Sequence, residues 1–245
     1  MQPLGSSRPQ AIFFDLDETL VDNTRPMQRL FVEVFEVYFP ACVVHGRLEA
    51  DIAQALKTEV YALWESLFET DSDDLMATMF RSTLRQCQLD VSAASAMARH
   101  LVDAAANALQ LRPGAAMLLE QLNNAGIATG IITNGIEVLQ MAKIERFALQ
   151  EKVDTVVVSE AAGAHKPDVR VFKYALDKLG VPAARAWHVG DHPLNDVTGA
   201  IACGMRGILY RPEDANSERF QLDAGELSAP DGHVAHLLQV AELLA

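Results

Sequence analysis

The chain alternates between two patterns of apolar positions, one typical of buried strands and one typical of amphipathic helices. The first pattern opens at Ala11–Phe14, a continuous apolar run of the kind that forms a strand buried on both faces. After residue 23 this pattern is replaced by apolar positions spaced three and four apart, as on one face of a helix. We therefore predict an all-helical module at residues 24–109.

From residue 110 onward, strand and helix patterns alternate. Short apolar runs predict strands at 127–133, 156–158, 186–189 and 207–210. Helical spacing lies between these runs, and this alternation is typical of a parallel sheet covered by helices. We expect an α/β fold with a Rossmann-like, doubly wound parallel sheet built from 1–23 and 110–245, and the helical domain inserted after its first strand. A last helix is predicted at 236–244, and the polar stretch before it predicts no element.

Composition and charge limit the classes of protein and partner. The 245 residues carry a net charge of −13, which disfavours a nucleic acid polymer or an anionic membrane as partner. The three cysteines, Cys42, Cys87 and Cys203, are odd in number and widely spaced, so they indicate a reducing compartment rather than a disulfide framework. Without an apolar run of signal-peptide or membrane-spanning length, the sequence predicts a soluble cytoplasmic protein.

The first strand ends in two acids, Asp15 and Asp17. Side chains two positions apart on an extended chain point the same way, so both carboxylates can converge on one spot. Two carboxylates at one spot repel each other unless a cation or a reaction uses them. A polar turn that merely ends the strand explains the same residues, and this stretch alone does not separate the two interpretations.

Three further groups of polar residues follow predicted strands, where open parallel sheets place ligand sites. Thr133-Asn134-Gly135 ends one strand and opens a helix, so its hydroxyl and N–H groups suit a phosphate oxygen. Lys166-Pro167 places a lysine before a proline that we expect to open a helix. Gly190–Asp196 adds Asp191 and Asp196, which brings the acids at this edge to four. Such a cluster suits a hard cation, and Mg²⁺ is the usual one.

Taken in order, these four motifs resemble those of the haloacid dehalogenase-like hydrolases, and the resemblance covers nearly the whole chain. The helical insertion between the first and second motifs resembles the mobile helical cap of the family's phosphatase branch. Residues 130–180 resemble the family's pyrimidine nucleotidases and N-acylneuraminate-phosphate phosphatases, and residues 188–196 resemble its flavin-precursor phosphatases.

The resemblance implies a role for each motif residue. Asp15 would be the nucleophile that forms an aspartyl-phosphate, and Asp17 the general acid and base. Mg²⁺ would be held by the side chains of Asp15 and Asp191 and by the backbone carbonyl of Asp17. The phosphoryl oxygens would be bound by Thr133, Asn134 and Lys166. Asp196 would orient Lys166 or a metal-bound water.

The resemblance implies a Mg²⁺-dependent phosphomonoesterase acting on a small phosphorylated metabolite, of the nucleotide monophosphate or sugar phosphate type. Three alternatives stay open. A 2-haloacid dehalogenase of the same family lacks the second acid of the first motif, and Asp17 argues against it. A phosphomutase shares all four motifs. An inactive binding module would leave the clustered acids unused, at a net cost in stability.

Overall fold

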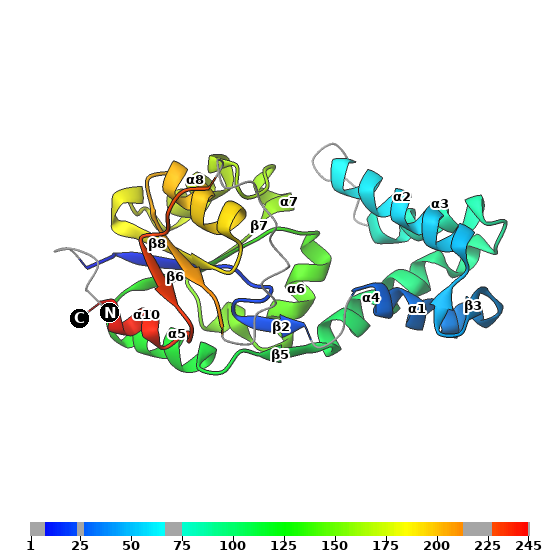
Figure 1. The fold of residues 1–245 in the computed structure, drawn as a ribbon, viewed down its shortest axis with the longest axis horizontal. Coiled ribbons are helices and arrows are strands. Elements are labelled where there is room, and N and C mark those ends of the chain that lie inside the picture. The colour runs from blue at the N-terminus through cyan, green and yellow to red at the C-terminus, as the bar shows by residue number, and fades with distance from the viewer. Residues whose placement is uncertain (1–7, 24–26, 67–74, 213–226, 245) are drawn as a thin grey trace. The chain divides into compact units, whose positions relative to one another are not determined.

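The chain folds into two compact units (Figure 1). The computed structural model describes residues 8–23, 27–66, 75–212 and 227–244. The first unit consists of Met1–Asn23 and Gln110–Ala245, and the second of Thr24–Leu109.

The first unit is built on a six-stranded sheet in the order β10-β9-β8-β1-β6-β7. Every neighbouring pair in it is parallel. Its strands are β1 (Ala11–Phe14), β6 (Ala128–Thr133), β7 (Thr155–Val158), β8 (Ala186–Gly190), β9 (Arg206–Tyr210) and β10 (Gly232–Val234). The four residues of β1 are fully buried because β1 lies between two other strands, with Phe14 opposite both Ile131 and Val189. The fold is therefore the predicted Rossmann-like α/β core.

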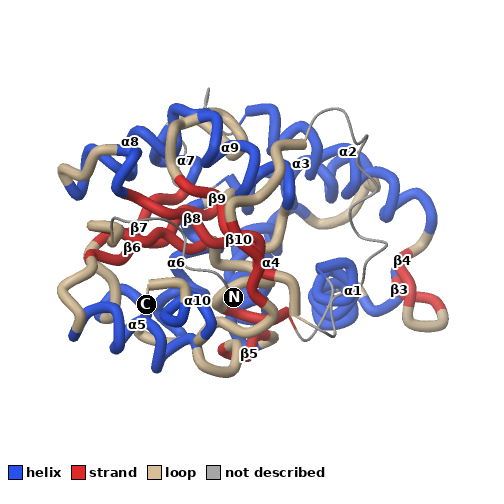
Figure 2. The backbone as a smooth tube through the Cα atoms, turned by 60° about the vertical axis from the view of Figure 1, so that its left-hand side comes forward, coloured by secondary structure: helices blue, strands red, loops and turns tan. Residues whose placement is uncertain are grey.

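Helices cover both faces of this sheet (Figure 2). They are α5 (Ala115–Asn124), α6 (Glu137–Arg146), α7 (Ser159–Ala162), α8 (Val169–Leu179), α9 (Gly199–Ala202) and α10 (Gln239–Glu242). On one face α8 buries Val171, Phe172 and Ala175 in a cluster that also holds Phe13 of β1. The opposite face carries α5 and α10. A strand covered in this way needs apolar residues at every position, which explains the continuous run at Ala11–Phe14.

The second unit is a bundle of α1 (Met27–Tyr38), α2 (Ala50–Ser66), α3 (Leu75–Gln86) and α4 (Ala94–Asn107). Its core contains Phe35, Phe80 and Met97, and the Phe35 and Phe80 rings lie 6.3 Å apart. It also contains a short antiparallel pair, β3 (Val43–Val44) with β4 (Arg47–Leu48). The prediction of an all-helical module missed this pair, because two-residue strands leave no alternating pattern.

A two-stranded sheet, β2 (Val21–Asn23) with β5 (Leu109–Leu111), forms where the chain leaves and re-enters the first unit. Next to it, Arg112 pairs with Glu18 at 3.3 Å and with Asp22 at 3.2 Å. Its backbone N–H also donates to the carbonyl of Leu20. These bonds hold the turn that carries Asp17 and Glu18 against the core.

Local structure differs from prediction in several places. The last helix spans only Gln239–Glu242. The polar stretch that precedes this helix, for which no element was predicted, has the strand β10 at its end. Residues 193–198 form a π-helical turn that leads directly into α9. Pro167 does not open α8, because Asp168 caps that helix and accepts from the N–H of Arg170. Single 3₁₀ turns lie at Pro40–Cys42, Val91–Ala93, Leu149–Glu151 and Ala183–Arg185. None of the helices in the described part is long and apolar enough to cross a membrane.

Candidate active site

The predicted site residues meet at the carboxyl edge of the sheet. Asp15 follows β1 and Asp191 follows β8, while Thr133 ends β6. Because β1 lies between β6 and β8, these three positions are neighbours although they are far apart in sequence. A cavity of about 360 Å³ opens at this edge. Its lining includes Asp15, Asp17, Thr133, Asn134, Lys166, Asp191 and Asp196, which are all seven residues selected from the sequence.

Lys166 links two of the acids inside this cavity. Its ammonium group lies 2.6 Å from a carboxylate oxygen of Asp15 and 2.6 Å from one of Asp196. Burial acts to lower the pKa of Lys166, but the two carboxylates outweigh it, so that pKa lies above its usual value. Lys166 is therefore a permanent cation placed between two buried acids.

The two acids respond differently to this environment. Burial raises the pKa of Asp15 well above its usual value, and the nearby carboxylates of Asp196 and Asp191 add to the rise, which Lys166 opposes. For Asp196, burial is outweighed by Lys166 and then by a hydrogen bond from His188, so its pKa is held well below the usual range. Asp196 is therefore a permanent anion. Around Asp15, the positive charge of Lys166 is too small to offset burial and the repulsion from the neighbouring carboxylates.

Asp196 is held from three sides. One carboxylate oxygen accepts from Lys166 and from Nε2 of His188 at 3.0 Å, and the other accepts from the backbone N–H of His192 at 2.9 Å. Its carboxyl also packs against the backbone of Gly190, where an added Cβ would lie 2.2 Å from the carboxyl carbon. Glycine at 190 is thus required for the position of Asp196.

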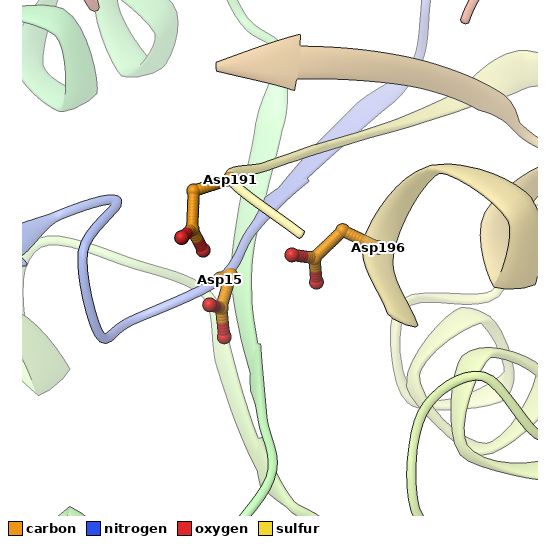
Figure 3. Close-up of side chains that lie close together, drawn as sticks. All are labelled: Asp15, Asp191 and Asp196. Carbon is orange, nitrogen blue, oxygen red and sulfur yellow. The ribbon is translucent and has the colours of Figure 1, made fainter. Parts of the chain in front are cut away.

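Three carboxylates at this edge offer oxygen atoms within 4.8 Å of one another, from Asp15, Asp191 and Asp196 (Figure 3). Oxygen ligands of this kind suit a hard divalent cation. The raised pKa of Asp15 also supports a cation at this spot, because a cation would favour the ionised form of the Asp15 carboxyl. Both oxygens of Asp196 already accept hydrogen bonds, so Asp15 and Asp191 are better placed to bind a cation.

The second motif is arranged differently from the sequence-based expectation. The N–H of Gly135 donates to Oγ of Ser159 at 3.0 Å, and the N–H of Glu137 donates to a carboxylate oxygen of Glu160. These N–H groups at the start of α6 are therefore occupied. The side chain of Asn134 bonds to the backbone N–H and carbonyl of Lys166, at 2.8 and 3.0 Å. Asn134 thus positions the Lys166 segment.

Two residues on α6 that lie outside the four motifs contact the site. Lys143 lies 2.8 Å from both carboxylate oxygens of Asp17, and Gln140 donates to Asp17 and to the hydroxyl of Thr133. Both side chains are buried. A polar pair three positions apart on the buried face of a helix was the available signal in the sequence, but nothing in the sequence identifies its partner.

A second cavity, of about 470 Å³, lies within the helical unit. Its lining includes Cys42, Cys87, Glu49 and Asp51, and no lysine or arginine is among the described residues that line it. A cavity with acids and no cation does not suit a phosphoryl group, so the cavity at the sheet edge is the candidate active site.

Fold and site together define a class: a parallel α/β core that presents clustered acids and a buried lysine at the carboxyl edge of its sheet. The sequence matches the haloacid dehalogenase-like hydrolase family over residues 12–210. The chain therefore belongs to this family and is a hydrolase.

Similar proteins include both phosphatases and a dehalogenase. The chain is 32% identical to pyrimidine 5'-nucleotidase YjjG of Escherichia coli (strain K12) over 198 residues, which cover 79% of this chain and 82% of the relative. It is 30% identical to glyceraldehyde 3-phosphate phosphatase of Pyrococcus furiosus over 242 residues, 97% of this chain and 93% of the relative. Among solved structures, a 2-haloacid dehalogenase from Pseudomonas syringae pv. Tomato DC3000 superposes with a TM-score of 0.73 at 26% identity, covering 96% of this chain and 98% of that one.

Proposed function

We propose that this hydrolase is a Mg²⁺-dependent phosphomonoesterase that acts on a small phosphorylated metabolite through an aspartyl-phosphate on Asp15. The observation that carries the proposal is a buried Asp15 beside a permanent cation, with a second acid, Asp17, lining the same cavity. The pyrimidine nucleotidase and the sugar-phosphate phosphatase among the relatives support a nucleotide monophosphate or sugar phosphate as substrate.

The two acids divide the chemistry between them. A carboxylate oxygen of Asp15 attacks phosphorus while the ester P–O bond breaks, and Asp17 gives its proton to the departing oxygen. Water then attacks the phosphorus of the aspartyl-phosphate and gives a proton back to Asp17. The bond from phosphorus to the Asp15 oxygen breaks, and inorganic phosphate leaves.

Lys166 and Thr133 bind the phosphoryl oxygens. Lys166 provides a full positive charge where negative charge spreads over those oxygens. The hydroxyl of Thr133 accepts a hydrogen bond from Gln140, which leaves its own hydrogen to donate to the substrate. Asn134 contributes by fixing the Lys166 backbone with its side-chain amide.

The charges around the cavity support a divalent cofactor. Acids outnumber basic side chains in the cavity lining, with Asp15, Asp17, Glu18, Asp191 and Asp196 against Lys166, and a divalent cation would offset this excess of acids. We assign Asp15, Asp191 and the backbone carbonyl of Asp17 as its protein ligands, with Asp196 orienting Lys166. When bound, Mg²⁺ supplies positive charge that offsets the repulsion between the Asp15 carboxylate and a phosphate. Chelation should abolish turnover and Mg²⁺ should restore it.

We also propose that the helical unit, Thr24–Leu109, acts as a cap that provides contacts to the remote part of the substrate. Replacing it with a short linker should then reduce kcat/KM on the natural substrate far more than on a small aryl phosphate, because remote binding energy contributes to catalysis. Equal losses on both substrates, in a folded protein, would remove this role. The three free cysteines fit a reducing compartment, and we place the protein in the cytoplasm.

A second candidate is a 2-haloacid dehalogenase, favoured by the similarity to the enzyme from Pseudomonas syringae. Halide leaves without a proton, so a dehalogenase gains nothing from an acid at Asp17. The test measures phosphate release from a panel of phosphorylated metabolites and halide release from 2-haloacids, with the same purified protein. Phosphate without halide supports the proposal, and halide without phosphate favours the dehalogenase.

A further inference from the structure

A buried ion pair connects α6 to the acid that we assign to proton transfer. The Nζ of Lys143 lies 2.8 Å from each carboxylate oxygen of Asp17, and Nε2 of Gln140 lies 2.9 Å from one of them. Lys143 is 6% exposed and Gln140 is 3% exposed, whereas the Asp17 side chain is 29% exposed and lines the cavity. The α6 side of the contact is thus buried, and the Asp17 side faces the space where substrate binds.

The spacing on α6 explains how both side chains reach one target. Residues three apart on a helix lie on the same face, so Gln140 and Lys143 point to Asp17 together. A buried ammonium without a partner is costly, so Lys143 and Asp17 hold each other in place. With three hydrogen bonds from one rigid helix, the Asp17 carboxylate has little freedom to rotate.

The same helix also connects Asp17 with the phosphate-binding motif. Gln140 donates to Thr133 as well as to Asp17, so one amide group fixes the relative position of the two side chains. The Gln140 side chain packs against Gly135, where an added Cβ would lie 2.7 Å from Cγ of Gln140. Gly135 also has a φ of +154°, a backbone conformation that residues with a side chain rarely adopt. Glycine at 135 therefore leaves the space that the Gln140 side chain occupies between α6 and Asp17.

We propose that Lys143 is a positioning residue that, with the help of Gln140, holds Asp17 in the orientation for proton transfer to the leaving oxygen. This inference rests on the proposed phosphomonoesterase function. A general acid must lie within hydrogen-bond reach of the oxygen that it protonates, and a small misplacement costs much of its effect. A salt bridge with only a structural role would stabilise the fold and would not discriminate between substrates.

The test compares two phosphate esters that differ in their need for a proton. Ethyl phosphate expels a basic alkoxide and requires Asp17, whereas p-nitrophenyl phosphate expels an acidic phenol and requires it little. Lys143→Met should lower kcat/KM on ethyl phosphate by about 10²-fold, the size expected for a misplacement of about 1 Å. The loss on p-nitrophenyl phosphate should be much smaller. Because kcat/KM reports the steps up to departure of the leaving group, it isolates the acid role.

Three variants sharpen the comparison. Lys143→Arg keeps the cation and should retain more activity on ethyl phosphate than Lys143→Met. In an Asp17→Asn background, Lys143→Met should cause almost no further loss, because residues that act as a unit are not additive. Lys152→Met removes an exposed lysine from the same unit and should behave like the parent on both substrates.

The outcomes separate the inference from the function on which it rests. Equal losses on the two substrates in an active parent, or a full further loss in the Asp17→Asn background, overturn the positioning role and leave the phosphatase intact. Equal activity of Lys143→Arg and Lys143→Met also contradicts it. A folded parent that releases no phosphate from any ester overturns the proposed function, and this inference with it.

Discussion

Removing the Lys166 ammonium is the sharpest perturbation of the buried charge cluster. Lys166→Met keeps most of the side-chain volume and takes away the ammonium group that contacts both Asp15 and Asp196. The side chains of these three residues are 3%, 11% and 1% exposed, so water replaces little of the lost interaction. The variant therefore leaves two buried carboxylates without their common partner.

The expected cost follows from measured values for such sites. Breaking a buried ion pair by removing one partner costs about 3–5 kcal/mol of unfolding free energy. For a chain of this length each kcal/mol corresponds to about 2–4 °C, so the melting temperature should fall by roughly 6–20 °C. Lys173→Met, at an exposed position of α8, is the matched control and should change stability by less than about 0.5 kcal/mol.

The pH dependence of this difference has a definite sign. Without Lys166, burial and the neighbouring carboxylates raise the pKa of Asp15 unopposed by that lysine, and Asp196 loses the largest of the interactions that lower its pKa. A folded carboxyl with a raised pKa binds more protons than its unfolded counterpart, so stability falls as pH rises. The gap between Lys166→Met and the parent should therefore be largest near pH 7 and shrink toward pH 5. Thermal unfolding monitored by circular dichroism, with chelator present, measures it. If Lys166→Met has the same melting temperature as Lys173→Met at every pH, the electrostatic explanation is refuted.

The remaining predictions concern a glycine, a metal ligand and the thiols. Gly190→Ala places a Cβ 2.2 Å from the Asp196 carboxyl carbon, so it should cost about 1–3 kcal/mol in denaturant unfolding and most of the activity, and parent-like values would contradict the packing argument. Asp191→Asn should sharply raise the Mg²⁺ concentration needed for half-maximal turnover, and an unchanged metal titration removes Asp191 from the ligand set. Burial raises the pKa of the Cys42, Cys87 and Cys203 thiols. Iodoacetamide should therefore react more slowly with the folded protein at pH 7 than with glutathione, and the reaction should become faster as pH rises. Alkylation at pH 7 as rapid as that of glutathione would contradict the raised pKa values.

Much of the core fold could be predicted because the apolar pattern determines it locally. A strand covered on both faces must be apolar throughout, and Ala11–Phe14 meets this condition before two acids interrupt it. Parallel strands place their carboxyl ends at one edge, so Asp15, Thr133 and Asp191 could be grouped without coordinates. The roles assigned to these residues remain proposals.

The parts that could not be predicted depend on contacts between distant residues. Lys143 lies 126 positions from Asp17 in sequence, and its helical pattern alone fits a solvent-facing lysine equally well. The occupied N–H groups of α6 depend on Ser159 and Glu160, which come from the next strand–helix connection. The strand β10 has only three residues, too few for an alternating pattern to stand out from the polar stretch before it.

Phosphorylation of Asp15 is the central step of the proposed mechanism. Purified protein is mixed with Mg²⁺ and an excess of an aryl phosphate, quenched in acid within the first turnovers, and digested for peptide mass analysis, with Asp15→Asn as control. We predict a phosphoryl adduct on the peptide that contains Asp15, release of inorganic phosphate by the parent, and neither in the control. Phosphate release by Asp15→Asn at the parent's rate, or an adduct that maps to another residue, would contradict it.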